Sequence, residues 1–272
     1  MPYVKDPFQH SRISLPLTTP TVNYYDWCLG RPELNSWPNY TIHIDPVTGE
    51  RRRLHFVLDR LEQAATALVT SPSDGGLGLT AGQSGIVGIL SENCLEYPVL
   101  VFALLKIAVP VALLPSHSTL HETAALLKMT GVTSLFVSET RYSYVIAAAK
   151  EAGLPEDRIF ILQGGVAGKV SLPRVIEGVK SRGLPRVPTQ TVRDDTIAYL
   201  LFSSGTTGLP KAVMISHRNL MFAASQSFVI LEELLKLGAR RSLFTWRSCR
   251  GTTRWGPMLM FSGYLPPQLH SS

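Results

Sequence analysis

The chain has 272 residues, of which 45% are hydrophobic and 17% charged, a composition that excludes an intrinsically disordered or fibrous protein. The length is enough for one large domain or two small ones with a buried core. A formal net charge of +6 would suit nucleic-acid binding, but the arginines at 51–53 follow a turn sequence and are expected on a solvated hairpin arm.

The chain termini and the apolar runs predict a cytoplasmic location. Residues 1–10 lack the apolar core of a secretory signal, and Lys106 and Pro110 interrupt the apolar run 97–114 before it could span a bilayer. The last residues, 269–272, carry no peroxisomal S-K-L address, although an intact relative could have one.

In chain order, residues 1–40 are Pro-rich and irregular, with aromatic residues expected to pack on a larger body. Apolar spacing then predicts a helix over 54–69, followed by a Gly-rich loop over 71–85. Strands are predicted at 85–90, 109–114, 134–138 and 158–162, alternating with helices at 94–107, 120–129 and 143–152. This alternation is typical of βαβ units, so we expect a Rossmann-like α/β fold with a parallel sheet flanked by helices.

The remaining segments set the expected domain boundaries. Residues 164–195 are interpreted as a long surface connection before a new strand at 196–202. The predicted organisation is therefore an irregular lead-in (1–40), a first α/β subdomain (41–190), the start of a second subdomain (191–235) and an irregular tail (236–272).

The segment 203–211, read S-S-G-T-T-G-L-P-K, carries the chemistry. It follows a predicted strand directly, and a second strand is predicted behind it at 211–217. Small and hydroxylated residues let backbone N–H groups approach phosphate oxygens, hydroxyls add donors, and the lysine neutralises charge. We expect a loop that binds polyphosphate, formed by Ser203, Ser204, Gly205, Thr206, Thr207, Gly208 and Lys211.

Two other interpretations of Gly-rich sequence fit this chain less well. A flexible Ser/Gly/Thr linker would not need a strand on each side of 203–211. That segment is also not a Walker A loop, because its lysine stands six residues after Gly205 with no G-K-[ST]. The stretch 164–169 ends in Gly168-Lys169, but its spacing is one residue short and Val170 replaces Ser or Thr, so a surface loop is expected there.

Other chemistries find little support in the sequence. No G-x-S-x-G elbow exists, since the stretch 82–85 lacks the spacing. His117 and His121 could face one way on a helix, but further metal ligands at matching spacing are missing. The three cysteines are Cys28, Cys94 and Cys249; they are far apart and fit neither a disulfide framework nor a C-x-x-C metal pair, which indicates a reducing compartment.

Residues 203–211, with A-V-M-I-S-H-R-N at 212–219, closely resemble the signature of the adenylate-forming (AMP-binding) superfamily. In particular, the chain is similar to fungal acyl- or aryl-CoA ligases of the 4-coumarate–CoA ligase type, over roughly 40–229. Weaker matches lie at 88–93, 96–99 and 104–106. The sequence departs from the family pattern at Ala108 and Ala212, where glycine is usual.

The resemblance implies an AMP-forming acid–CoA ligase that uses ATP, Mg²⁺ and coenzyme A. A carboxylate would first be converted to acyl-AMP with release of pyrophosphate, and the acyl group would then pass to coenzyme A. The residues of 203–211 would hold the β- and γ-phosphates, by positioning and charge stabilisation rather than as nucleophiles. The acyl substrate stays open.

The last part of the chain does not resemble the family. The family's adenine-binding, ribose-binding and acid-bearing motifs, and its catalytic lysine, are not found after the loop. No Asp or Glu follows Glu233, and every basic residue after Lys236 other than histidine is an arginine. We expect 236–272 to derive from a retained intron or shifted frame, with a genuine lineage-specific tail as the alternative.

Two functions therefore stay open at this point. One is a ligase-family chain that lacks its downstream catalytic half and is inactive alone, with self-association through uncovered apolar surface. The other is a non-catalytic nucleotide-binding or interaction protein derived from such a ligase. Neither of these functions includes nucleic-acid binding.

Overall fold

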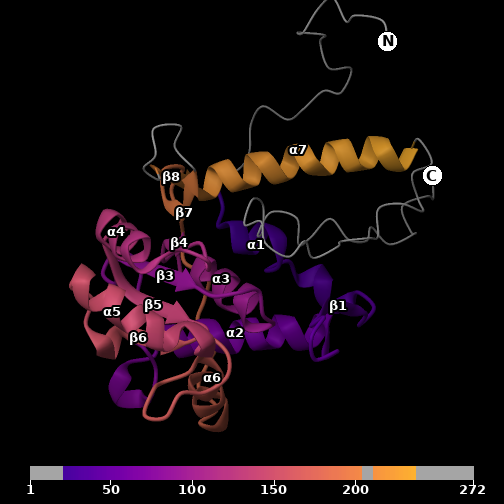
Figure 1. The fold of residues 1–272 in the computed structure, drawn as a ribbon. Coiled ribbons are helices and arrows are strands. Elements are labelled where there is room, and N and C mark those ends of the chain that lie inside the picture. Colours follow the sequence, from indigo (N-terminus) through magenta and orange to yellow (C-terminus); the bar gives the residue numbers. More distant parts are fainter. Residues whose placement is uncertain (1–20, 204–210, 237–272) are drawn as a thin grey trace, which may run out of the picture. The chain divides into compact units, whose positions relative to one another are not determined.

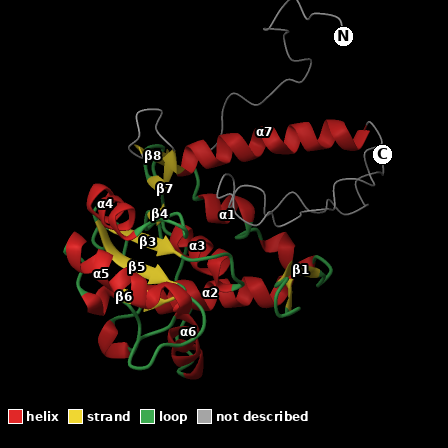
Figure 2. Ribbon diagram, viewed as in Figure 1, coloured by secondary structure: helices red, strands yellow, loops and turns green. Residues whose placement is uncertain are grey.

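A computed structural model describes residues 21–203 and 211–236, and Figures 1 and 2 show its elements. The helices are α1 (Tyr24–Cys28), α2 (Leu54–Val69), α3 (Glu96–Lys106), α4 (Leu120–Thr130), α5 (Tyr142–Ala152), α6 (Leu172–Ser181) and α7 (His217–Lys236). The strands are β1 (Thr41–Ile44), β2 (Arg51–Arg53), β3 (Ile86–Leu90), β4 (Val111–Leu113), β5 (Val132–Val137), β6 (Ile159–Ile161), β7 (Ile197–Ser203) and β8 (Lys211–Ser216). Residues 21–218 form one compact unit, and the rest of α7 belongs to a second.

The larger unit is built on a sheet with the strand order β6-β5-β3-β4-β7-β8. All neighbouring strands in it are parallel except β7 and β8, which are antiparallel. Strand β4 lies on one side of β3 in the sheet, and β5 lies on the other side. The crossovers β3–β4 and β4–β5 therefore run in opposite directions across the sheet. Because such crossovers are right-handed, their helices lie on opposite faces. The predicted Rossmann-like α/β fold with a mostly parallel sheet is confirmed.

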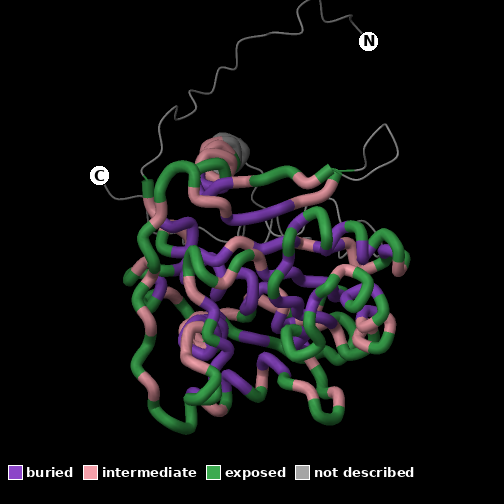
Figure 3. The backbone as a smooth tube through the Cα atoms, turned by 90° about the vertical axis from the view of Figure 1, so that its left-hand side faces the viewer, coloured by how far each residue is buried: buried purple, intermediate pink, exposed green. Residues whose placement is uncertain are grey.

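The helices form two layers that enclose the sheet. Helices α4 and α5 pack together on one side, while α2 packs against both α3 and α6 on the other. A cluster of buried side chains joins α4 and α5 to the sheet, including Leu126, Val145, Leu135 and Val137. Figure 3 shows buried segments running through the interior, with exposed segments mostly at the periphery. Between the charged residues at its two ends, helix α3 is apolar on all sides, as expected for a helix that is buried almost completely.

The structure corrects two sequence expectations about regular elements. Residues 164–195 contain α6, an amphipathic helix that buries Leu172, Val175, Ile176 and Val179, so this stretch is not one long connection. The described part of the lead-in, 21–40, is also not irregular throughout, since it holds α1 and a short 3-10 helix at Pro32–Ser36. Its aromatic residues Tyr24 and Tyr25 are buried, as expected.

The arginine triplet is only partly solvated. The side chains of Arg51 and Arg53 are exposed, but Arg52 is buried. Its guanidinium lies 2.9 Å from a carboxylate oxygen of Glu96, which also binds Arg60 at 2.7 Å. The expectation of a fully solvated arm is therefore wrong for Arg52, because a buried carboxylate 44 residues away pairs with it.

No helix in the described ranges combines the length and apolarity that crossing a bilayer requires. The predicted boundaries near 190 and the tail 236–272 are not tested by the fold, and residues 237–272 lie outside the described part of the chain.

Candidate functional site

The predicted phosphate loop connects two antiparallel strands. Ser203, the last residue of β7, pairs with Lys211, the first of β8, and Phe202 pairs with Ala212 behind them. The side chains of Ser203 and Lys211 are exposed. The other predicted phosphate-binding residues, Ser204, Gly205, Thr206, Thr207 and Gly208, lie outside the described residues. The structure therefore brings the two ends of the loop together beside solvent.

Strand β7 carries the loop from the core to the edge of the sheet. Ala198, Tyr199 and Leu200 are buried, and Tyr199 pairs in parallel with Val111 of β4. Burial decreases along the strand until Ser203, which is exposed. The loop thus leaves at the carboxyl edge of the parallel strands, where open α/β sheets bind their ligands.

The other end of the hairpin is tied to the core by His217. Its backbone N–H donates to the carbonyl of Thr196 at 3.0 Å, and its Nδ1 accepts from the backbone N–H of Tyr24 at 3.1 Å. Burial lowers the pKa of His217 from 6.5 to about 4, so the imidazole is neutral near pH 7 and can accept this bond. The ring of Tyr24 in turn stacks on Phe102 of α3.

His217 was not singled out by sequence reasoning. The available signal was its place in the family-like stretch after Lys211, but its partner Tyr24 is 193 residues away in the chain. Its Nε2 is buried and has no hydrogen-bond partner among the described residues. We interpret His217 as a positioning residue that fixes the base of the hairpin.

Buried polar contacts also fix the segment that leads into β7. The backbone N–H of Gln190 donates to the carbonyl of Lys106 at 2.9 Å. The side-chain amide of Asn23 donates to the carbonyls of Leu105 and Gln190, at 2.8 and 3.0 Å. The ammonium group of Lys106, which is buried, pairs with Glu62 at 3.1 Å. These bonds hold the lead-in and the approach to β7 against the end of α3.

The second Gly-rich stretch, 164–169, is a loop, as the sequence predicts. Carboxylates already occupy its donors, because Glu139 accepts from the backbone N–H of Gly165 at 3.1 Å and Glu156 lies 2.6 Å from the ammonium group of Lys169. These contacts make it a poor phosphate site.

The two cysteines in the described ranges are not activated as nucleophiles, and no metal centre is found there. Burial raises the pKa of Cys28 to about 12 and that of Cys94 to about 11, so neither thiol forms much thiolate near pH 7. Both are unpaired. The side chain of His121 is 90% exposed and faces Glu151 at 3.8 Å. No three metal-ligating side chains gather anywhere in the described ranges.

A comparison with protein-family models matches residues 34–246 to the family described as AMP-binding enzyme. The chain belongs to the AMP-binding enzyme family. Among curated relatives, this AMP-binding enzyme is 38% identical to an adenylate-forming reductase of Stachybotrys bisbyi over 143 residues, which is 51% of the chain and 12% of the reductase. It is 32% identical to 4-coumarate–CoA ligase-like 6 of Oryza sativa subsp. japonica over 163 residues, covering 60% of the chain and 25% of the relative.

A third relative is an acyl-CoA ligase of Aspergillus fumigatus, 28% identical over 200 residues, with 67% of the chain and 32% of the relative covered. The AMP-binding enzyme chain thus spans between about an eighth and a third of the length of these relatives. The expected membership of the AMP-binding family is confirmed, and two of the three relatives carry acyl-CoA or 4-coumarate–CoA ligase names.

Solved structures confirm the fold of this AMP-binding enzyme. The anthranilate CoA ligase AuaEII, crystallised with anthranoyl-AMP, matches with a TM-score of 0.62 at 21% identity, over 76% of this chain and 37% of that one. A long-chain-fatty-acid-CoA ligase from Archaeoglobus fulgidus matches with a TM-score of 0.63 at 22% identity, over 80% and 41%.

Proposed function

We propose that the β7–loop–β8 unit holds the polyphosphate of ATP in an AMP-forming acid–CoA ligase. The observation that carries the proposal is the pairing of Ser203 with Lys211 at the exposed carboxyl edge of the sheet. This pairing closes a loop rich in glycine and hydroxyl groups beside one ammonium group. Family membership and the ligase names of the relatives support the same reaction class.

In the proposed reaction, a carboxylate oxygen of the substrate attacks the α-phosphorus of ATP, and the bond to the bridging oxygen of pyrophosphate breaks. The thiolate of coenzyme A then attacks the acyl carbon, and AMP leaves. Lys211 and the loop N–H and hydroxyl groups would stabilise the charge that moves onto pyrophosphate. By resemblance to the family, Mg²⁺ would supply further charge neutralisation at the phosphates when bound.

For the 272-residue chain taken alone, we propose ATP binding without turnover. Removing one preorganised transition-state donor already costs on the order of 10²–10³ in rate, and the sequence shows none of the family's adenine, ribose or acid-bearing motifs. ATP–pyrophosphate exchange with a panel of carboxylic acids is expected to stay at background. Robust exchange would overturn this part of the proposal.

An ATP titration of three proteins tests the binding role. Lys211→Gln should weaken ATP affinity on the order of tenfold to a hundredfold, the usual value of one charge-assisted contact. Lys169→Gln is the matched control, because that lysine also stands at the end of a Gly-rich stretch but is paired with Glu156. Equal affinity for all three proteins would remove the loop from the phosphate site.

The second candidate is a non-catalytic protein that associates through its sheet edge. Strand β8 is the last strand of the described sheet, and it exposes Val213 by 46% and Met214 by 67%. Such an edge favours pairing with another strand. Sedimentation velocity over a range of concentrations tests this, with Met214→Lys as the comparison. A monomer at all concentrations would remove this candidate.

A further inference from the structure

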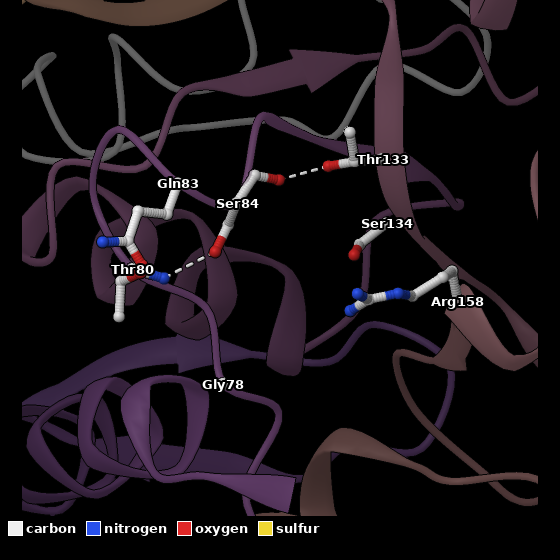
Figure 4. Close-up of a pocket in the computed structure, with 7 residues that line it drawn as sticks. All are labelled: Gly78, Thr80, Gln83, Ser84, Thr133, Ser134 and Arg158. Carbon is white, nitrogen blue, oxygen red and sulfur yellow. Dashed lines mark hydrogen bonds between the residues drawn. The ribbon is translucent and has the colours of Figure 1, made fainter.

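A polar hollow opens at the edge of the sheet opposite the phosphate loop. It has a volume of about 320 Å³ and is lined by Gly78, Thr80, Gln83, Ser84, Thr133, Ser134 and Arg158 (Figure 4). These residues precede or begin the parallel strands β3, β5 and β6, so they lie at the amino ends of the strands. Ser203 ends β7 at the carboxyl edge. The hollow is therefore separate from the site proposed for ATP.

An irregularity in the sheet shapes this hollow. Ile86 pairs with Val132 and Val87 pairs with Ser134, so Thr133 is an extra residue in β5. Such bulges re-aim side chains. The hydroxyl of Thr133 donates to the carbonyl of Ser84. Gly85 has a φ of 67°, and a Cβ on it would lie 2.6 Å from Cγ2 of Thr133, so only glycine fits this approach.

Three of the side chains that line the hollow have a donor left without an acceptor. Ser134 is 1% exposed, and its Oγ has no hydrogen-bond partner among the described residues, which is costly for a buried hydroxyl. Oγ of Ser84 accepts from the backbone N–H of Thr80 at 2.6 Å, so its own proton is left to donate. Oε1 of Gln83 likewise accepts from the Thr80 hydroxyl, which leaves the amide NH₂.

Charge in the hollow comes from Arg158. No carboxylate lines the hollow, and no ion pair forms on this guanidinium within the described residues. Figure 4 shows the side chain of Arg158 reaching toward Ser134. One cation and several donors therefore converge from three separate segments, the 78–85 loop, β5 and the turn before β6. An acceptor-rich anion would satisfy all of them.

We propose that this hollow binds the phosphate group of a small phosphorylated metabolite. A tetrahedral phosphate presents oxygens in several directions, which suits donors arriving from three segments better than a planar carboxylate does. Arg158 would supply the charge, and Ser134 and Ser84 would donate to phosphate oxygens. The volume leaves room for a small organic group beside the phosphate.

Calorimetric titration of the full chain with inorganic phosphate, and separately with ribose 5-phosphate, tests the proposal. All variants carry Lys211→Gln, so that phosphate binding at the ATP loop does not enter the result. Arg158→Gln should weaken binding on the order of tenfold or more. Arg174→Gln is the control, because Arg174 is also an exposed arginine and lies on α6, outside the hollow.

Ser134→Ala separates binding from folding. Because the Ser134 hydroxyl has no hydrogen-bond partner to lose among the described residues, this variant without ligand should melt at no lower temperature. Its affinity for phosphate should fall. If ribose 5-phosphate binds more tightly than inorganic phosphate, the ligand is a phosphorylated metabolite, as proposed. If inorganic phosphate binds more tightly, the ligand is free phosphate and the metabolite part of the proposal is wrong. No measurable phosphate binding, equal binding by Arg158→Gln, or tighter Arg158-dependent binding of acetate would overturn the proposal.

Discussion

Replacing His217 by glutamine should remove part of the protein's sensitivity to acid. The buried imidazole accepts from the backbone N–H of Tyr24 at 3.1 Å, and glutamine can offer an oxygen to the same donor but cannot be protonated in this range. At pH 7.5 the variant should therefore be only modestly less stable, by about 1 kcal/mol for an imperfectly placed hydrogen bond.

The pH dependence follows from the pKa of His217, which burial lowers from 6.5 to about 4. Between these values the unfolded chain binds more protons than the folded one, so stability rises with pH and is lost on acidification. Integrated from pH 7.5 to pH 5.0, this one residue costs the wild type about 2 kcal/mol of unfolding free energy. The same loss should not occur in His217→Gln.

Urea denaturation at the two pH values measures this difference. His43, whose pKa burial also lowers to about 4, titrates in both proteins and cancels. His121→Gln is the control for the chemical change itself, because that side chain is 90% exposed and makes no buried hydrogen bond in the described ranges. If the difference in unfolding free energy between the wild type and His217→Gln is the same at pH 7.5 and pH 5.0, the assignment of His217 as a buried neutral acceptor is wrong.

Two further pairs of substitutions test backbone strain and a buried charge cluster in the fold. Ala108 has a φ of 51°, a left-handed conformation that costs a side chain roughly 1–2 kcal/mol. Ala108→Gly should therefore raise the unfolding free energy by up to about 1 kcal/mol. The control Ala212→Gly, in β8, should lower it by about 0.5–1 kcal/mol. If both variants lose the same unfolding free energy, Ala108 is not strained. Glu96→Ala should cost about 3–5 kcal/mol in urea unfolding, because it removes the buried carboxylate that binds both Arg52 and Arg60 and leaves them only the exposed partners Glu50 and Glu177. Glu177, whose side chain is 62% exposed beside Arg60, should tolerate the same change with a loss under about 1 kcal/mol.

Local patterns predicted most of the α/β core from sequence. The helix over 54–69 and the strands that alternate with helices after residue 85 follow from apolar spacing alone, which the structure reproduces within a few residues. Helix α6 was missed because glycine, proline and charge surround it. Its signal was nevertheless present in the helical spacing of its four buried apolar residues.

Features that depend on distant partners could not be predicted in this way. The burial of Arg52 requires Glu96, which lies beyond α2 and β3 in the chain. The anchoring of His217 requires Tyr24 at the other end of the unit. The Thr133 bulge depends on the register between β3 and β5. Each of these is a pairing between segments, and no local sequence pattern encodes it.

For the candidate site, sequence predicted the two strands and the loop between them, and the structure confirms the strands. The role of the loop in binding phosphate stays a prediction, because the residues that would make the contacts lie between Ser203 and Lys211.

Hydrogen exchange of the loop amides tests that role most directly. If backbone N–H groups of 204–210 donate to phosphate oxygens, exchange in a peptide covering 203–211 should slow when ATP and Mg²⁺ are added. AMP, which lacks the β- and γ-phosphates, should slow it much less, and Lys211→Gln should reduce the ATP effect. Unchanged exchange at ATP concentrations that saturate binding would contradict the account.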